Sequence, residues 1–163
     1  MAIVAVVTLA LDQLTKEWAL RALGDGQVRP LIGDWITLRL LRNPGAAFSF
    51  GDSNTLLTTL IAVVVTVLVL VWSRRLNDQA WAWAFGLIVG GSLGNLVDRL
   101  VRDPGPGRGH VVDFIDYFGW FVGNVADIAI VGAAVAIAVF TAMGLHLDGS
   151  REGSDEHPSA TDV

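Results

Sequence analysis

Four long apolar stretches separated by more polar connections form the main pattern of this 163-residue chain. They cover residues 2–23, 55–72, 80–101 and 124–145. Each is close to the roughly 20 residues that an α-helix needs to cross about 30 Å of hydrocarbon. A segment inside lipid must satisfy its backbone hydrogen bonds internally, so the stretches are predicted to be transmembrane helices. An even number of spans places both chain termini on one side of the membrane.

The connections between these stretches are of different kinds. Residues 35–41 alternate in a way that is typical of a strand, which predicts a small β-like cradle at the membrane surface. Residues 102–109 are rich in Gly and Pro and predict a loop. The apolar and aromatic residues 111–121 predict a segment that lies at the membrane interface. The whole pattern predicts an all-α membrane protein with four transmembrane helices, a β-like cradle and an interfacial segment.

Composition supports this interpretation. Hydrophobic residues make up 53% of the chain and charged residues only 17%, too few to cover the surface of a soluble domain. Of the net charge of −5, a charge of −4 lies in residues 148–163. We therefore predict a four-helix membrane domain over residues 1–147 and an acidic, disordered tail over residues 148–163. The sequence contains no basic surface that would indicate nucleic acid as a partner. The lack of cysteine excludes disulfides and thiolate metal sites.

Polar side chains interrupt the apolar stretches at a few positions. Ionisable groups at membrane depth cost a few kcal/mol each and are usually functional or paired. If the helices alternate in direction, these side chains gather near one membrane face, where the two long connections also meet. They are Asp12, Lys16, Asn95, Asp98, Arg99, Asn124 and Asp127, joined by Asp113 and Asp116 of the interfacial segment. This convergence predicts a functional site.

Helix packing is the alternative explanation for some of these residues. Asp12 and Lys16 are four residues apart, so they are expected to form an ion pair that orients the first span. A glycine stripe at Gly86, Gly90 and Gly94 predicts the close approach of another helix. Two Asn-x-x-Asp units, one in each of the last two spans, are harder to explain by packing alone, because each pair projects from one side of its helix.

Two carboxylates in a partly dry pocket suggest acid–base chemistry without a nucleophilic side chain. Close like charges share one proton, so the ionised carboxylate accepts a proton from water while the protonated one polarises a carbonyl. The candidates are Asp98, Asp113, Asp116 and Asp127. Arg99 next to Asp98 favours its ionised form, which suits a structural role. Asp113 and Asp127 are flanked by apolar residues, and we choose them as the dyad.

Two other functional classes are less consistent with the sequence. His110 lies close to two aspartates, but the chain has no His-Glu-x-x-His motif, no second nearby His and no Cys, so we predict no metal site. A small proton or ion transporter would also use buried Asp, Lys and Arg. Such a relay needs ionisable groups at several depths, whereas residues 55–72 hold none.

Five motifs occur together in a characteristic order. They are Asp12-Gln13-Leu14-Thr15-Lys16, Asn43-Pro44-Gly45-Ala46-Ala47-Phe48-Ser49, Gly90-Gly91-Ser92-Leu93-Gly94-Asn95-Leu96-Val97-Asp98-Arg99, Val111-Val112-Asp113-Phe114-Ile115-Asp116, and Asn124-Val125-Ala126-Asp127. On these motifs the chain resembles bacterial lipoprotein signal peptidase, also called signal peptidase II, over about residues 1–147. The five together are specific, although each alone is weak.

The resemblance implies an aspartyl endopeptidase, with no cofactor, that removes signal peptides from diacylglyceryl-cysteine prolipoproteins. It maps the catalytic pair to Asp113 and Asp127, in agreement with the choice made from environment, and it maps Asp12 and Lys16 to structural support. The residues that line and brace the site map to Asn43, Asn95, Asp98, Arg99 and Asn124.

The resemblance also implies a location in the bacterial inner membrane. Both termini are then cytoplasmic, and the cradle and the active site face the extracytoplasmic side, although the raw count of Arg in the long connections favours the opposite orientation. Prolipoproteins and membrane lipid are the expected partners, and we expect a monomer. Two features depart from the family pattern: Gly123 stands where an aromatic residue is usual, and the stretch from Asp113 to Asp127 is short.

Overall fold

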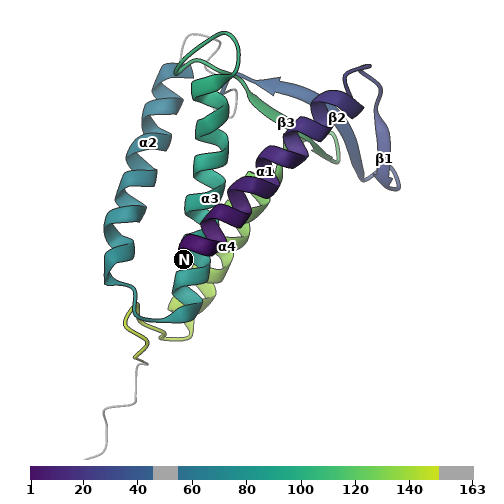
Figure 1. Ribbon diagram of the computed structural model, residues 1–163. Helices are drawn as coiled ribbons and strands as arrows, with labels where there is room; N and C mark the ends of the chain where they lie inside the picture. Colours follow the sequence, from purple (N-terminus) through teal and green to yellow (C-terminus); the bar gives the residue numbers. More distant parts are fainter. Residues whose placement is uncertain (46–54, 151–163) are drawn as a thin grey trace, which may run out of the picture.

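The computed structural model describes residues 1–45 and 55–150, which form four α-helices and a four-stranded sheet (Figure 1). The helices are α1 (Ala2–Ala22), α2 (Thr55–Trp72), α3 (Gln79–Val101) and α4 (Val125–Ala142). The predicted apolar stretches therefore end within a few residues of the observed helices. Residues 151–163, most of the predicted acidic tail, lie outside the described residues.

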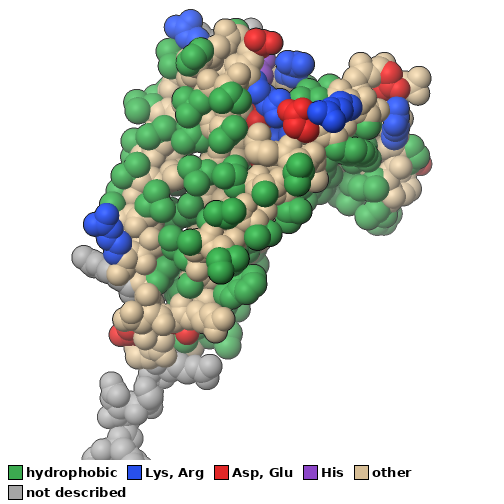
Figure 2. Space-filling view, viewed as in Figure 1, with side chains coloured by type: hydrophobic (Ala, Val, Ile, Leu, Met, Phe, Trp, Pro, Cys, Tyr) green, Lys and Arg blue, Asp and Glu red, His purple; other side chains and the backbone are tan. Residues whose placement is uncertain are grey.

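Three of the helices, α2, α3 and α4, are long and apolar enough to cross a membrane. Helix α1 contains Asp12, Lys16 and Glu17 within its 21 residues, so its composition is less typical of a span. Figure 2 shows hydrophobic side chains covering the helices on this face, while charged side chains gather toward the two ends. Apolar side chains on the outside of a bundle are the arrangement that a bilayer stabilises.

The glycine stripe of α3 is the surface on which α1 packs. A Cβ atom added at Gly90 would lie 2.6 Å from the backbone oxygen of Ala5, and one added at Gly86 would lie 2.8 Å from Cβ of Val4. Because real Cβ atoms do not come this close, only glycine permits this helix separation. The prediction of a close helix contact at the stripe is confirmed.

The sheet is antiparallel, with strand order β1-β2-β3-β4. Its strands are β1 (Arg29–Ile32), β2 (Ile36–Asn43), β3 (Val111–Tyr117) and β4 (Phe121–Gly123). The strand predicted at residues 35–41 is confirmed as β2. Residues 111–121, for which the sequence predicts a place at the membrane interface but no particular element, form β3 and β4. Both faces of β3 are buried, so the sequence lacks the polar–apolar alternation that marks a half-exposed strand.

The sheet lies at the end of the bundle where α3 ends and α4 begins (Figure 1). Phe114 of β3 packs with Ala19 and Leu23 at the end of α1, and its ring meets that of Trp18 edge-on, with centroids 6.2 Å apart. This small core fixes β3 against α1. It thereby holds Asp113, the neighbour of Phe114, beside the ends of α3 and α4.

Candidate active site

A buried charge cluster joins α1 to α3. Lys16 Nζ lies 2.8 Å from Asp12 Oδ2 and 2.9 Å from Asp98 Oδ2, and all three side chains are fully buried. Asp12 Oδ1 also accepts a hydrogen bond from the backbone N–H of Ala126 at 3.0 Å, in the first turn of α4. The predicted pair of Asp12 and Lys16 is confirmed, and it belongs to a larger cluster that connects three helices.

Asp98 connects this cluster to the sheet. It accepts hydrogen bonds from Arg102 Nε at 2.7 Å and from the backbone N–H of Val112 at 3.1 Å. Two cations and a strand N–H therefore surround one carboxylate, an arrangement that stabilises its ionised form. Gln13 donates to Asp98 at 3.3 Å and to the carbonyl of Gly94 at 3.0 Å, a bracing role that our sequence analysis missed.

Among the described residues the guanidinium of Arg99 forms no ion pair with Asp98, although the two residues are adjacent in sequence. Its Nη1 donates to the carbonyl oxygens of Gly109 at 3.2 Å and Asn43 at 3.5 Å. Arg99 therefore ties the connection before β3 to the end of β2. In this position it holds the backbone of Asn43, whose side chain reaches the next part of the site.

Asp113 of β3 accepts two amide hydrogen bonds. Asn43 Nδ2 donates to Oδ2 at 2.8 Å, and Asn124 Nδ2 donates to Oδ1 at 2.6 Å. The carboxyl group is almost fully buried. Burial, opposed by the Asn43 hydrogen bond and assisted by the negative charge of Asp127, raises the pKa of Asp113 to about 6.

Asp127 lies in the first turn of α4 and forms a reciprocal cap with Asn124. The backbone N–H of Asn124 donates to Asp127 Oδ2 at 3.0 Å, and the backbone N–H of Asp127 donates to Asn124 Oδ1 at 3.1 Å. Such a box satisfies two N–H groups that a helix start leaves without partners. The same motif that begins α4 therefore also sets the position of the Asp127 carboxylate.

Asn95 and Asn124 link the two aspartates. Asn95 Nδ2 donates to Asp127 Oδ1 at 3.1 Å, while Asn95 Oδ1 accepts from Asn124 Nδ2 at 3.2 Å. Lys16 Nζ also donates to Asn95 Oδ1, at 2.9 Å. Because an ammonium group can only donate, it requires the amide oxygen of Asn95 to face it. The amide nitrogen of Asn95 is then directed at Asp127.

Both aspartates line one cavity of about 280 Å³ at the sheet end of the bundle. Asn43, Asn95 and Arg99 also line it, so most of the residues predicted to form a site meet here. Asn124 and Asp98 lie behind this wall and act on it through the hydrogen bonds described above. The remaining wall is less polar and comes from residues to which the sequence analysis assigns no role: Gly45, Thr58, Ala62, Val111 and Phe121.

Asp116 and His110 take no part in this cavity. Asp116 is three residues beyond Asp113 along β3, so the two side chains lie on opposite faces of the strand. Its Oδ2 pairs with Arg39 Nε at 2.6 Å. Within the described residues no group of three or more His, Cys, Asp or Glu side chains is arranged to hold a metal ion.

Gly123 has a steric role next to the site. A Cβ atom there would lie 2.7 Å from Cε1 of Phe121 and 2.9 Å from Asp127 Oδ2. The ring of Phe121, two residues earlier, occupies the space that a side chain at position 123 would need. An aromatic ring therefore still reaches the cavity wall, but from a different position in the chain.

The fold and the site are those of a membrane protein with two carboxylates in a cavity at one end of its helix bundle. Each carboxylate accepts hydrogen bonds from asparagine side chains. The sequence model of the family "Signal peptidase (SPase) II" matches residues 4–143. Proteins named lipoprotein signal peptidase are similar: one from Rhodococcus jostii (strain RHA1) is 48% identical over 154 residues, covering 94% of this chain and 78% of the relative. Another from Mycobacterium avium (strain 104) is 47% identical over 155 residues, covering 94% and 85%.

Solved structures agree with the fold. A bacterial membrane enzyme determined by the in meso method at 2.3 Å resolution aligns with a TM-score of 0.77, covers 96% of this chain and 93% of its own, and is 22% identical. A second, at 1.9 Å resolution, has a TM-score of 0.74 and 23% identity and covers 85% and 90%. The chain belongs to the signal peptidase II family, which is a family of membrane proteases.

Proposed function

We propose that this protein is an aspartyl endopeptidase that removes signal peptides from diacylglyceryl-cysteine prolipoproteins. Family membership and the relatives named lipoprotein signal peptidase support the substrate class. The observation that carries the catalytic assignment is that Asp113 and Asp127 line one cavity and are joined through the amides of Asn95 and Asn124. This arrangement supplies two acids within one hydrogen-bond network.

In the proposed reaction the two carboxyl groups hold one proton between them. The ionised group accepts a proton from a water molecule, and the water oxygen attacks the carbonyl carbon of the scissile peptide bond. The protonated group donates a hydrogen bond to the carbonyl oxygen, where negative charge develops. When the tetrahedral intermediate collapses, the C–N bond breaks and the leaving nitrogen takes a proton from the dyad. One water is consumed. After both products have left, the two carboxyl groups again hold one proton between them.

The surrounding side chains would position this pair. The carboxylate oxygens of Asp113 and Asp127 accept hydrogen bonds from Asn43, Asn95 and Asn124. These hydrogen bonds restrict the orientation of both carboxylates and direct them into the cavity. Arg99 holds the chain at Asn43, and Asp98 holds the start of β3. We propose Asn43, Asn95, Asp98, Arg99 and Asn124 as binding or supporting residues, with no metal or cofactor in the reaction.

We also propose the placement of the chain in its membrane. All four helices cross the bilayer of the bacterial inner membrane, with α1 stabilised in its path by the ion pair of Lys16. Both termini are cytoplasmic, the sheet lies at the extracytoplasmic surface, and the protein acts as a monomer. Exposed Trp35, Phe118 and Trp120, in the β1–β2 and β3–β4 turns of the sheet, support contact with lipid headgroups.

The test is cleavage of a lipidated prolipoprotein by Asp113→Asn and Asp127→Asn in vesicles, with insertion checked by protease protection. Each variant is expected to insert normally and to lose roughly 10³-fold in cleavage rate, within the range for removing a general acid or base. Asp116→Asn is the matched control, because Asp116 is a buried carboxylate on the same strand that faces away from the cavity. Near-normal cleavage by either dyad variant contradicts the assignment of that residue.

A further inference from the structure

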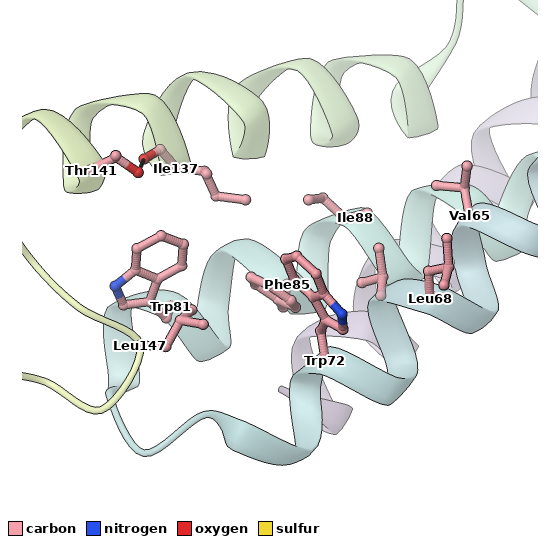
Figure 3. Close-up of a pocket in the computed structure, with 10 residues that line it drawn as sticks. Val65, Leu68, Trp72, Trp81, Phe85, Ile88, Ile137, Thr141 and Leu147 are labelled. Carbon is pink, nitrogen blue, oxygen red and sulfur yellow. Dashed lines mark hydrogen bonds between the residues drawn. The ribbon is translucent and has the colours of Figure 1, made fainter.

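A second and larger cavity extends along the helices toward the opposite end of the bundle. It has a volume of about 510 Å³, within the range of roughly 300–1,000 Å³ that small-molecule sites occupy. Figure 3 shows it between α2, α3 and α4, with Leu68, Trp72, Phe85 and Ile137 among its apolar lining residues. Trp81 and Asn95 are 14 residues apart on α3, so Trp81, at the far end of this cavity, lies about 21 Å from Asn95 along the helix.

Trp81 has an unused hydrogen-bond donor in this cavity wall. The residue is only 6% exposed, and its Nε1 has no hydrogen-bond partner in the part of the chain that the structure describes. Its ring is held by edge contacts with Phe85 and Phe140, at centroid distances of 6.2 and 5.5 Å. Buried N–H groups nearly always have an acceptor, so this one indicates a missing acceptor atom.

The donor lies where the apolar cavity meets a smaller one. This second space, of about 250 Å³, is lined by the turn that follows α4, including His146, and it shares Trp81, Thr141 and Leu147 with the larger cavity. In Figure 3 the indole nitrogen of Trp81 lies on the Leu147 side, away from Trp72. The Thr141 hydroxyl already donates to the Ile137 carbonyl at 2.9 Å. An occupant of both spaces therefore needs a long apolar part and an acceptor at the junction.

We propose that the two adjoining cavities bind one membrane glycerophospholipid, in the leaflet opposite to the candidate active site. An acyl chain fills the apolar cavity, and the ester carbonyl of that chain accepts the hydrogen bond of Trp81 Nε1. Trp81 lies in the first turn of α3, which is the depth at which indole N–H groups meet the polar edge of a bilayer. A lipid ester joins an apolar chain to an acceptor that carries no hydrogen.

Other occupants match these features less well. A transmembrane helix of a partner that passes through the cavity uses its backbone carbonyls within the helix, so it would have to end at Trp81 to offer a free acceptor. Residues 151–163 of this chain include only Pro158, Ala160 and Val163 as apolar residues, too few to fill an apolar cavity. A diacyl lipid satisfies both the apolar wall and the single donor.

The test compares ester-linked and ether-linked phospholipids of identical chain length and headgroup. Full-length protein is reconstituted in an equal mixture of the two and released into native mass spectrometry, which weighs the lipid that stays bound. An ether oxygen is a weaker acceptor than an ester carbonyl, so wild-type protein is expected to retain the ester lipid about three- to ten-fold more. This comparison needs no variant.

Variants then locate the lipid. Trp81→Phe keeps an aromatic ring without the N–H and is expected to remove the ester preference, while Trp83→Phe, on the exposed side of the same helix, is expected to keep it. Ile137→Trp fills the apolar cavity and is expected to reduce retention of both lipids. Equal retention of ester and ether lipids by wild-type protein, no retained lipid, or an unchanged preference in Trp81→Phe overturns the proposal. A retained peptide or a second copy of the chain in place of lipid also overturns it.

Discussion

Replacing Lys16 by Met removes a cation from a fully buried cluster and changes little else. The ammonium group contacts Asp12 Oδ2 at 2.8 Å, Asp98 Oδ2 at 2.9 Å and Asn95 Oδ1 at 2.9 Å. Met has a similar length and no charge, so the variant keeps the packing and leaves two buried carboxylates without their shared partner. Removing one member of a buried ion pair typically costs about 3–5 kcal/mol.

Part of the loss is expected to depend on Asp12. Asp98 keeps Arg102 as a partner, whereas Asp12 keeps only neutral donors, the N–H of Ala126 and the amide of Gln13. The double variant Asp12→Asn with Lys16→Met should therefore recover about 1–3 kcal/mol relative to Lys16→Met alone, a coupling of the size seen between contacting residues.

The measurement is the unfolding free energy in mixed micelles titrated with a denaturing detergent. Arg21→Met is the matched control, because Arg21 is 83% exposed on the same helix and lies 4.0 Å from Glu17. It should change stability by less than about 0.5 kcal/mol. A loss in Lys16→Met no larger than in Arg21→Met would refute the view that these charges depend on one another.

Cleavage should also fall in Lys16→Met, at conditions where the protein stays folded. Without the ammonium donor, the Asn95 amide is held only by Asn124 and can turn its nitrogen away from Asp127. A hydrogen bond to a charged group is worth about 1.5–3 kcal/mol, so its loss corresponds to a decrease of roughly ten-fold or more. Unchanged cleavage by folded Lys16→Met would show that Lys16 does not position Asn95.

Three further outcomes follow from the same structure. The pKa of Asp113 is raised from 3.8 to about 6, so the folded state retains a proton that the unfolded state releases. The contribution of Asp113 to stability should be greatest below pH 4 and fall by about 3 kcal/mol as pH rises through 6. Asp113→Asn should therefore lose less stability than the wild type over this pH range when unfolding is measured as a function of pH. Gly90→Ala should destabilise the protein by a few kcal/mol, because the added Cβ would meet the backbone of Ala5. Gly132→Ala has open space around it and should stabilise α4 by about 0.5–1 kcal/mol. Equal shifts of the melting temperature in the two variants would contradict this. Asn124→Leu should reduce cleavage of a lipidated precursor by at least about ten-fold, because Asn124 contacts both aspartates, and normal cleavage would remove the amide bridge from the account.

The helices could be predicted from sequence because lipid imposes a simple rule on them. Residues 55–72 are uncharged and match α2 at both ends. The pair of Asp12 and Lys16 and the glycine stripe of α3 also follow from helical spacing alone. In these cases the physical cause is local, since neighbours three or four residues apart in sequence are neighbours on the helix.

The sheet and parts of the cavity could not be predicted in the same way. The mostly apolar sequence of Val111–Tyr117 reflects burial on both faces of the strand. Such burial removes the alternation of polar and apolar residues by which a strand is recognised. The pairing of Arg39 with Asp116 depends on the register between β2 and β3. The place of Thr58 and Ala62 in the cavity wall depends on how α2 packs beside the site. These are contacts between distant parts of the chain, and nothing in the local sequence marks them.

The most direct test of the central claim, that Asp113 and Asp127 act as one unit, is the cleavage rate of Asp113→Asn, Asp127→Asn and the double variant, measured side by side on a lipidated prolipoprotein. If the two carboxyl groups share one proton in one reaction, removing either should cost about as much as removing both, so the three rates should agree within a few-fold. A double variant whose loss equals the product of the two single losses would mean that the residues act independently, and would contradict the dyad.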